Sequence, residues 1–330
     1  VQMRAVVQHS YGSADVLRVA EVEPPEIGDG EVLVRVRAAS VHAGDALLML
    51  GIPDVMRLGF GLTRPRTPIP GLDVAGVVER AGSRVSRFSA GDAVFGNGRA
   101  TLAELTAAKQ DQLAAKPDGL SFERAAVLTV SGLTALKAMR DVGRVQPGQS
   151  VLITGASGGV GVYAVQIAKA LGADVTGVCG ASIVELVRSL GADTVIDYTT
   201  TAVTEPDRRY DVILDNAGTQ TIAEWRRILA PRGTLMPNSG TAGGRWVGPL
   251  PRMGQAALTS PFVSQRLKTF LSTSNPADLQ ALTDLVTSGA VRPVISATYP
   301  LAQAAEAMRV VASGHTSGKV AITIGTTLDD

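Results

Sequence analysis

The stretch that decides the fold is Val151-Leu152-Ile153-Thr154-Gly155-Ala156-Ser157-Gly158-Gly159-Val160-Gly161, followed by the apolar, helically periodic residues 162–171. Its first four residues predict a buried strand, the glycines predict a tight turn, and the residues after them predict a helix. In such a turn the backbone N–H groups and the helix N-terminus can face a pyrophosphate without intervening side chains. The stretch therefore predicts a dinucleotide-binding βαβ unit. The alternative is a tight strand-to-helix turn that binds no ligand.

The glycine spacing is a variant of the G-x-G-x-x-G pattern in which Ala156 stands at the first position. Gly158 allows the backbone to approach a phosphate closely, and Gly161 allows the helix to pack closely against the strand. We expect the cofactor to contact the second half of the turn, namely Ser157, Gly158, Gly159, Val160 and Gly161.

The end of the next predicted strand, about 20 residues further on, is the usual place of an acidic residue that binds the ribose of NAD. Here residues 178–182 read Val-Cys-Gly-Ala-Ser and contain no carboxylate. NADPH is therefore favoured over NADH because no negative charge opposes its 2′-phosphate, although no Lys or Arg stands there to attract it. Cys179 fits a small buried side chain better than a reactive thiol.

The pattern of the chain changes at about residue 122. Before this point, short alternating apolar runs separated by Gly and Pro predict a mostly β region. After it, short buried strands alternate with helical stretches, which predicts a parallel sheet with crossover helices. The predicted fold class is α/β, with two domains.

Three segments near the C-terminus complete this prediction. A helix is expected over residues 276–288, with Asn275 as its N-cap and Gly289 just past its end. The last strand, residues 319–324, is expected to return to the first domain. Residues 239–261 are rich in Gly and Pro and have no clear period, so they are expected to form a long loop near a site.

The composition of the 330 residues excludes several classes of protein. With 45% hydrophobic and 18% charged residues, the chain is globular rather than disordered. A formal net charge of +1 provides no field that attracts nucleic acid or a membrane surface, and no apolar run approaches the roughly 20 residues that span a bilayer. Its single cysteine excludes an intrachain disulfide and any site of several thiolates. We expect a cytoplasmic protein with a small-molecule substrate, without nucleic acid or membrane as partner.

Four further motifs accompany the glycine turn. They are 39–45 (Ala-Ser-Val-His-Ala-Gly-Asp), 70–78 (Pro-Gly-Leu-Asp-Val-Ala-Gly-Val-Val), 132–135 (Gly-Leu-Thr-Ala) and 190–198 (Leu-Gly-Ala-Asp-Thr-Val-Ile-Asp-Tyr). In this order, together with the turn, they resemble the zinc-independent, quinone oxidoreductase-like branch of the medium-chain dehydrogenase/reductase superfamily.

The resemblance implies two domains and a homodimer. The first is a GroES-like, mostly β substrate domain over residues 1–122, completed by about 298–330. The second is a Rossmann domain, with a doubly wound parallel sheet that binds NADP, over residues 123–297.

The resemblance also implies further cofactor contacts. Ser182 stands where relatives often have Arg, so it can hydrogen-bond a phosphate but cannot neutralise it. Lys319 has a second interpretation, as a solvated charge at the start of a strand. The implied contacts are Thr134, Ser182, Tyr198, Asn216, Gly218, Gly240, Phe262 and Lys319.

Zinc-dependent members of the superfamily use Cys and His ligands for a catalytic ion and four clustered Cys for a structural one. This chain has Leu72 where a ligand would follow the Pro70-Gly71 motif, and His42 stands without partner ligands in the slot of the first Cys. We therefore expect no metal. His42 is expected in the substrate cleft, where it orients or protonates a carbonyl. The alternative is a hydrogen-bonded histidine without a catalytic part.

Three residues are assigned to the substrate pocket: Asp45, Arg245 and Trp246. Arg245 and Trp246 could instead form a subunit contact. Asp45 and Asp73 could form a carboxylate pair for acid/base work, but their counterparts in the family fix loops beside the cleft. Enoyl reductases of the superfamily often place a proton-donating Tyr in the stretch that here covers residues 46–53, which contain none.

The resemblance implies an NADPH-dependent, metal-independent reductase that transfers hydride from nicotinamide C4 to a quinone or to the β-carbon of an α,β-unsaturated carbonyl. Two alternatives remain. One is a carbonyl/alcohol oxidoreductase that works without zinc. The other is an NADPH-binding sensor or structural module with little turnover, which the missing tyrosine favours.

Overall fold

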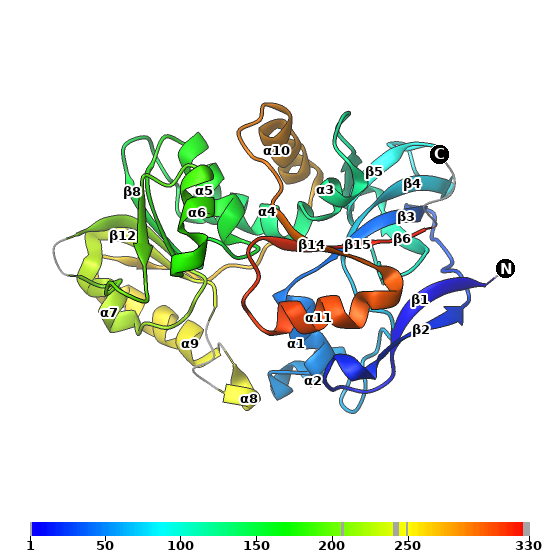
Figure 1. Cartoon of the computed structure of the whole chain (residues 1–330), viewed down its shortest axis with the longest axis horizontal. Helices are drawn as coiled ribbons and strands as arrows, with labels where there is room; N and C mark the ends of the chain where they lie inside the picture. The colour runs from blue at the N-terminus through cyan, green and yellow to red at the C-terminus, as the bar shows by residue number, and fades with distance from the viewer. Residues whose placement is uncertain (1, 206–207, 240–243, 249, 326–330) are drawn as a thin grey trace. The chain divides into compact units, whose positions relative to one another are not determined.

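The computed structural model describes residues 2–205, 208–239, 244–248 and 250–325, and it divides into two units (Figure 1). The first unit comprises residues 1–133, 273–287 and 293–330, and the second comprises 134–272 and 288–292. The first unit is larger than the region that the sequence assigned to the substrate domain. The reason is local packing: α3 (Phe122–Ala126) packs on β3 (Glu31–Val41), and α10 (Pro276–Thr287) packs on β7 (Leu113–Ala115).

The first unit is built on an antiparallel sheet with one parallel pair at its edge. Among the described residues the order is β14-β15-β3-β4-β5-β7, and β6 also pairs with β3. The last strand lies in this unit, where Val320 of β15 pairs with Val41 of β3. The remaining strands are β4 (Asp73–Ala81), β5 (Ala93–Asn97), β6 (Leu105–Lys109), β14 (Ile295–Pro300) and β15 (Lys319–Thr323), with β1 (Met3–Gln8) and β2 (Leu17–Val22) forming a separate antiparallel pair.

One hydrophobic core of the first unit lies between this sheet and two helices. α1 (Ala43–Leu50) and α11 (Ala304–Ala312) contact each other, and Figure 1 shows them side by side. Met49 and Met308 are buried in this core against Val34 and Val36 of β3. Over residues 34–38 of β3 the apolar side chains alternate with the exposed Arg35 and Arg37, as expected where a strand has one buried face, whereas residues 32–34 and 38–41 are buried without interruption. A short helix, α2 (Arg57–Phe60), follows α1.

The second unit contains the parallel sheet that the glycine turn predicts. Among the described residues its order is β10-β9-β8-β11-β12-β13, and every pair is parallel. The order reverses at β8, which is the arrangement of a doubly wound α/β sheet. The strands are β8 (Ser150–Thr154), β9 (Asp174–Cys179), β10 (Thr194–Asp197), β11 (Tyr210–Asp215), β12 (Leu229–Pro237) and β13 (Arg266–Leu267).

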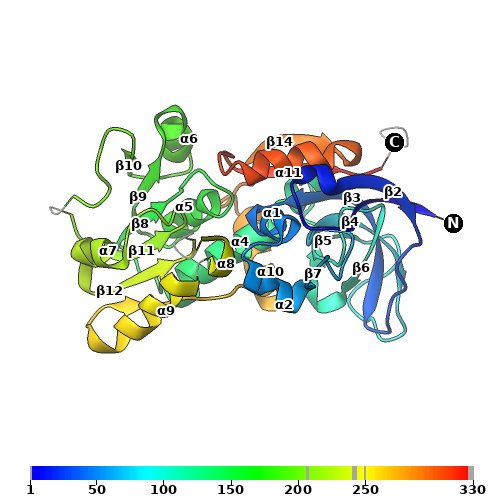
Figure 2. The same ribbon diagram turned by 90° about the horizontal axis from the view of Figure 1, so that it is seen from below.

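Helices cover both faces of this sheet. α5 (Gly161–Ala170) follows β8, and α6 (Val184–Ser189) comes after β9. Figure 2 shows these two helices apart from α7 (Ile222–Ile228) and α9 (Leu250–Thr259). Trp225 of α7 packs with Leu152 and Ile213, which are neighbours in the sheet register. The strands are therefore buried on both faces, which explains their continuous apolar runs.

The expectation of a long loop over residues 239–261 is wrong. This segment contains α8 (Gly244–Val247) and nearly all of it from 250 onward is α9. In α9, Arg252 and Ala256 lie one turn apart and are both buried, so tertiary packing of one helix face outweighs the weak local pattern. The helix expected near residue 276 is confirmed as α10, where Asn275 Oδ1 accepts the backbone N–H of Asp278. α4 (Thr129–Leu136) continues into a π-helical turn at Lys137–Val142.

Candidate active site

The glycine turn joins β8 to α5 as the sequence predicts. A Cβ atom on Gly161 would lie 2.0 Å from the carbonyl oxygen of Gly155, so no larger residue fits there. A Cβ atom on Gly158 would meet only that same oxygen, at 3.3 Å, which leaves this side of the backbone open. The N–H of buried Ala156 donates to the carbonyl of Val178, which ties the turn to β9. The turn is therefore held by backbone contacts and presents no large side chain where a phosphate could approach.

A carboxylate that sequence reasoning missed organises the adjacent strand end. Asp215, the last residue of β11, is fully buried. Its Oδ1 accepts the Thr154 hydroxyl at 2.7 Å and the Gly218 N–H at 3.0 Å. Its Oδ2 accepts the Trp225 indole N–H at 2.7 Å and the guanidinium of Arg252, itself 5% exposed. The available signal was a single Asp directly after the apolar run of residues 212–214.

This network orders two of the predicted cofactor residues. The Asn216 side chain donates to the Thr154 carbonyl at 3.1 Å and accepts from the Asn238 amide at 2.8 Å. The N–H of Gly218 is held by Asp215, and Gly218 has φ +70. The loop after β11 is thus fixed at the carboxyl edge of the sheet, where doubly wound folds bind ligands.

The end of β9 presents the residues that were expected to set cofactor choice. Ser182 and Tyr198 are exposed, and a Cβ atom on Gly180 would lie 3.5 Å from the Tyr198 hydroxyl. Sequence reasoning missed Asp197, which pairs in register with Cys179 and supplies a carboxylate from the neighbouring strand. Burial raises the pKa of the Cys179 thiol, and the charge of Asp197 raises it further. An unreactive, buried Cys179 is consistent with this environment.

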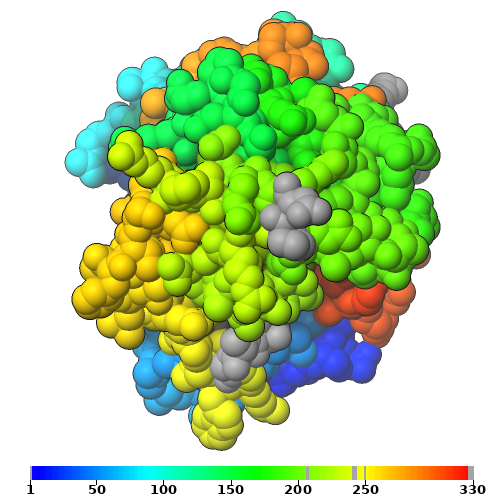
Figure 3. Space-filling view, turned by 90° about the vertical axis from the view of Figure 1, so that its left-hand side faces the viewer, coloured from blue at the N-terminus to red at the C-terminus, as the bar shows by residue number. Residues whose placement is uncertain are grey.

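Four further predicted cofactor and pocket residues lie in separate segments of the second unit. Thr134 is half-buried in α4, whereas Phe262 is 87% exposed in a 3₁₀ turn. Arg245 and Trp246 lie on the exposed α8, Trp246 being 73% exposed. Figure 3 looks onto this unit, whose surface runs from green to gold along the chain. Gly240 lies outside the described residues.

One prediction from the sequence was that Lys319 is a solvated charge at the start of a strand. The structure places its side chain in a buried environment instead. Its side chain is 1% exposed, and Nζ lies 3.3 Å from Oδ2 of the fully buried Asp73. Asp73 also accepts the Ser40 hydroxyl at 2.6 Å, the Val130 N–H at 2.9 Å and the Asn97 amide at 3.5 Å. The solvated interpretation of Lys319 is therefore wrong, because its ammonium is paired inside the first unit.

His42 and Asp45 form a closed pair at the start of α1. His42 is the N-cap: its Nδ1 accepts the Asp45 backbone N–H at 3.3 Å, and the Asp45 carboxylate accepts the His42 backbone N–H at 2.9 Å. The His42 side chain is 14% exposed and that of Asp45 only 2%, so Asp45 reaches solvent very little. Burial raises the pKa of the Asp45 carboxyl, against the attraction of His42.

Among the described residues, no group of three or more His, Cys, Asp or Glu side chains is placed to hold a metal ion. Leu72, at the expected ligand position, is 41% exposed. None of the helices in the described part of the chain is long and apolar enough to cross a membrane.

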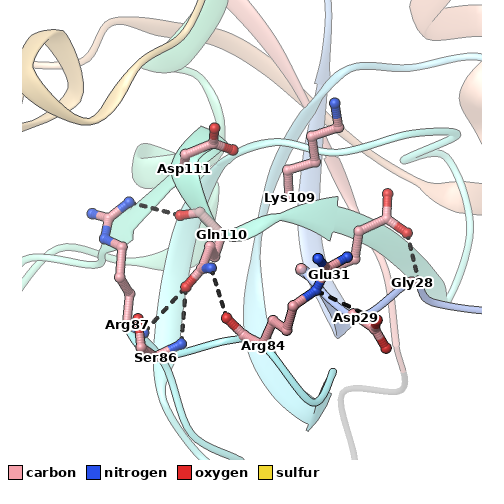
Figure 4. A pocket seen from close by; sticks show the side chains of 10 residues that line it. Gly28, Asp29, Glu31, Arg84, Ser86, Arg87, Lys109, Gln110 and Asp111 are labelled. Carbon is pink, nitrogen blue, oxygen red and sulfur yellow. Dashed lines mark hydrogen bonds and ion pairs between the residues drawn. The ribbon is translucent and has the colours of Figure 1, made fainter.

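A surface pocket of about 520 Å³ lies in the first unit. In Figure 4 the Gln110 side chain faces the loop that carries Arg84, Ser86 and Arg87, and it bonds the backbone of all three. The pocket contains both acidic and basic side chains, and none of the residues predicted above to bind cofactor or substrate lines it. The pocket is lined by Gly28, Asp29, Gly30, Glu31, Arg84, Ser86, Arg87, Lys109, Gln110 and Asp111.

A parallel sheet with a glycine turn at its switch point, in one chain with a mostly antiparallel unit, is typical of the class of dinucleotide-dependent oxidoreductases. Comparison with known proteins gives the family. The model "Alcohol dehydrogenase GroES-like domain" matches residues 28–133, and the model "Zinc-binding dehydrogenase" matches residues 190–322.

Whole-chain relatives agree. A chloroplastic quinone-oxidoreductase QR1 from Triphysaria versicolor is 34% identical, over 97% of this chain and 98% of that protein. A chloroplastic NADPH-dependent alkenal/one oxidoreductase from Arabidopsis thaliana is 32% identical, over 97% and 79%. The structure of a Coxiella burnetii quinone oxidoreductase, 26% identical, superposes with a TM-score of 0.87 over 98% of this chain and 100% of that one. The chain therefore belongs to the quinone oxidoreductase-like branch of the medium-chain dehydrogenase/reductase superfamily, with a GroES-like and a Rossmann-type part, and is an oxidoreductase at that level.

Proposed function

We propose that this chain is an NADPH-dependent, metal-independent reductase that transfers hydride to a quinone or to the β-carbon of an α,β-unsaturated carbonyl. The observation that carries the proposal is the glycine turn at the switch point of the parallel sheet, in a chain whose full-length relatives bear the names of quinone and alkenal reductases. Homodimerisation and a cytoplasmic location remain predictions of the sequence.

The residues present fit a dinucleotide. The space that a Cβ atom on Gly161 would fill is closed by backbone, whereas the Gly158 side is open. The N–H of Gly158 is donated to the Gly155 carbonyl at 3.0 Å, so the N–H groups of Ser157 and of residues 159–161 would hold the pyrophosphate, which the open side of Gly158 lets approach. The Asp215-ordered loop at Asn216 and Gly218 would face the nicotinamide half. When bound, the cofactor supplies the hydride, and the protein supplies orientation and polar groups.

The preference for NADPH is expected to be moderate. The end of β9 carries no acid, and Tyr198 stands beside it, which favours a 2′-phosphate. Asp197 on the next strand opposes that phosphate by charge. NADPH should bind several-fold more tightly than NADH by calorimetry, and equal dissociation constants would contradict this. Asp197→Asn and Ser182→Arg should each widen the preference, the second by about 1 to 3 kcal/mol for a charged hydrogen bond.

The decisive experiment follows NADPH oxidation at 340 nm, the nicotinamide absorbance band, with quinones, enones and aldehydes as substrates. The proposal predicts turnover with a quinone or an enone, and undiminished turnover after exhaustive chelation. Reduction of aldehydes alone would support the carbonyl/alcohol alternative, and binding without turnover would support the sensor alternative. A stoichiometric metal whose removal abolishes turnover would overturn metal independence.

A pair of glycine variants ties activity to the proposed cofactor site. Gly161→Ala should weaken NADPH binding about tenfold or more, because its methyl group collides with the Gly155 carbonyl. Gly254→Ala in α9 is the matched control, since a Cβ atom there meets nothing within 4 Å. Equal NADPH affinities of the two variants would remove the turn from the proposed site.

A further inference from the structure

α9 is attached to the second unit mainly through a charged side chain. Its two buried residues are Arg252 and Ala256. Ala256 contributes only a methyl group to the hydrophobic core around Trp225. The apolar side chains of Leu250 and Leu258 are largely exposed, at 48% and 75%. Because so little apolar surface is buried, packing alone attaches α9 weakly, and the position of the helix depends on the contacts of Arg252.

Arg252 joins the ends of two neighbouring strands. Its Nη2 donates to Oδ2 of Asp215, the last residue of β11, and its Nη1 donates to the carbonyl oxygen of Ser239, which follows β12, at 3.3 Å. The backbone N–H groups of Asn238 and Ser239 donate in turn to the carbonyl oxygen of Asp215, at 2.9 and 3.2 Å. One guanidinium group thus fixes both strand ends at the carboxyl edge of the sheet, where a doubly wound fold binds its ligand.

The two loops that Arg252 fixes are also bonded to each other. Nδ2 of Asn238 donates to Oδ1 of Asn216 at 2.8 Å. Oδ1 of Asp215 accepts the Gly218 N–H at 3.0 Å, while Oδ2 binds the guanidinium. The Asp215 carboxylate therefore connects Arg252 to the loop after β11, which is proposed above to face the nicotinamide half of the cofactor. Because Arg252 is only 5% exposed, it acts on a cofactor through this loop.

A purely structural role does not explain the burial of Arg252. Its Nε is buried and makes no hydrogen bond to the residues that the structure describes. Burying a charged donor without a partner costs free energy. A buried ion pair can often be replaced by apolar residues without loss of stability. An apolar residue at position 252 could anchor α9, but it could not bind the ends of both strands.

We propose that Arg252 is a positioning residue for the dinucleotide, which fixes the loops after β11 and β12 to α9, so that docking of α9 and binding of NADPH strengthen each other. This inference rests on the proposed function. Coupling between two equilibria is reciprocal. If the docked helix tightens NADPH binding by some factor, bound NADPH stabilises the docked helix by the same factor.

The first test compares NADPH with a ligand that lacks the nicotinamide half. Arg252→Met should raise the dissociation constant for NADPH about tenfold by calorimetry, a usual size for such coupling. The dissociation constant for adenosine 2′,5′-bisphosphate should stay within about twofold, because this ligand would bind at the end of β9, away from the two loops. Equal losses for both ligands, or no loss for NADPH, would overturn the inference. A parent protein that binds no NADPH would overturn the proposed function and this inference with it.

A conservative variant separates the charge of Arg252 from its geometry. In Arg252→Lys the ammonium group can pair with Asp215, but it lacks the planar fork that also reaches Ser239. The dissociation constant for NADPH should therefore rise about threefold, between those of the parent and of Arg252→Met. A parental affinity would overturn the role of the fork in fixing both loops. This variant keeps the buried carboxylate paired, so it answers the question even if Arg252→Met does not fold.

Ile228→Ala is the matched control for lost stability. Ile228 is fully buried in the same hydrophobic core as Ala256 and carries no polar group. Its truncation should lower the free energy of unfolding, as core truncations do, and leave the dissociation constant for NADPH within about twofold. If Ile228→Ala weakens NADPH binding as much as Arg252→Met does, the affinity follows overall stability rather than the position of the loops, and the inference is overturned.

Hydrogen exchange tests the reciprocal effect. In the parent chain, saturating NADPH should slow the amide exchange of residues 250–259 roughly tenfold, the factor by which Arg252→Met is expected to weaken NADPH binding. In Arg252→Met, saturating NADPH should leave the exchange of these amides unchanged. Equal slowing in the two proteins would show that other contacts couple α9 to the cofactor, and would overturn the role of Arg252.

Discussion

Each unit of the molecule buries one carboxylate against a cation from a distant part of the chain. In the first unit Asp73 meets Lys319, and in the second Asp215 meets Arg252. Both carboxylates are fully buried, and each accepts four donors, one of them the cation. A buried charge with this many donors is compensated, whereas one that loses its partner is strongly destabilising.

The two pairs differ in what else fixes their partners. Lys319 starts β15, and both β15 and β4 are already hydrogen-bonded to β3, so the sheet ladder holds the two residues in place. Arg252 lies on α9, which no sheet ladder connects to β11, and its buried Nε has no hydrogen-bond partner in the described residues. Strand pairing thus already places Lys319 beside Asp73, and their ion pair adds to it. Asp215 and Arg252, by contrast, hold α9 in place through their side chains. Substitutions in the second pair should therefore cost more.

The largest effect is expected for Asp215→Ala. It leaves the Arg252 guanidinium buried and unpaired and removes the acceptor of Thr154, Gly218 and Trp225. We expect a loss of about 5 kcal/mol in the free energy of unfolding, measured by urea denaturation, with weaker NADPH binding from disorder of the 216–218 loop. A loss below about 1 kcal/mol would show that α9 is held by other contacts.

A smaller loss is expected for Lys319→Met, about 3 kcal/mol in the same measurement, because the sheet and three neutral donors still hold Asp73. The double variant Asp73→Asn with Lys319→Met should recover part of this loss, since it removes both charges. NADPH affinity should stay within about twofold if Lys319 acts only through Asp73, because the site then keeps all its phosphate donors. A tenfold drop in NADPH affinity in a variant that still folds would instead support the direct contact between Lys319 and the cofactor that the family resemblance implies.

The next effect depends on pH. Burial raises the pKa of the Asp45 carboxyl in the folded protein, so the folded state holds this proton more tightly than the unfolded one. Its contribution to stability is therefore complete below the unfolded pKa of about 3.9 and is lost as pH rises through the higher folded pKa. Relative to Asp45→Asn, the parent should become less stable in urea denaturation as the pH rises from about 4, just above the unfolded pKa, to about 7. A constant difference would contradict the raised pKa.

The smallest effect is expected at a surface pair. Oε1 of Glu185 lies 2.6 Å from Nη1 of Arg188 in α6, and the two side chains are 85% and 57% exposed. Glu185→Gln should change the free energy of unfolding by less than about 0.5 kcal/mol, and the change should shrink further at high salt. A loss comparable to that of Lys319→Met would mean that burial is not what separates the two kinds of ion pair.

Local patterns predicted the parts of the site whose geometry is local. The turn at residues 155–161 and the Asn275-capped helix could be recognised because each depends on backbone conformations that only certain neighbouring residues allow. The capping box between His42 and Asp45 has the same character, since its two partners are three residues apart.

The sequence by itself determined that this chain has a strand, a glycine turn and a helix in succession, that its fold is of the α/β class, and that it carries the motifs of its family, because these follow from residue spacing and periodicity. Only the tertiary structure decided that Asp215 binds Arg252, that Lys319 is buried on Asp73, and that Asp197 lies beside Cys179. The partners in the first two pairs are 37 and 246 residues apart, and in the third they are neighbours through strand register. From the sequence alone a charged residue is expected to be exposed to solvent, because only folding can provide the partner that makes its burial favourable.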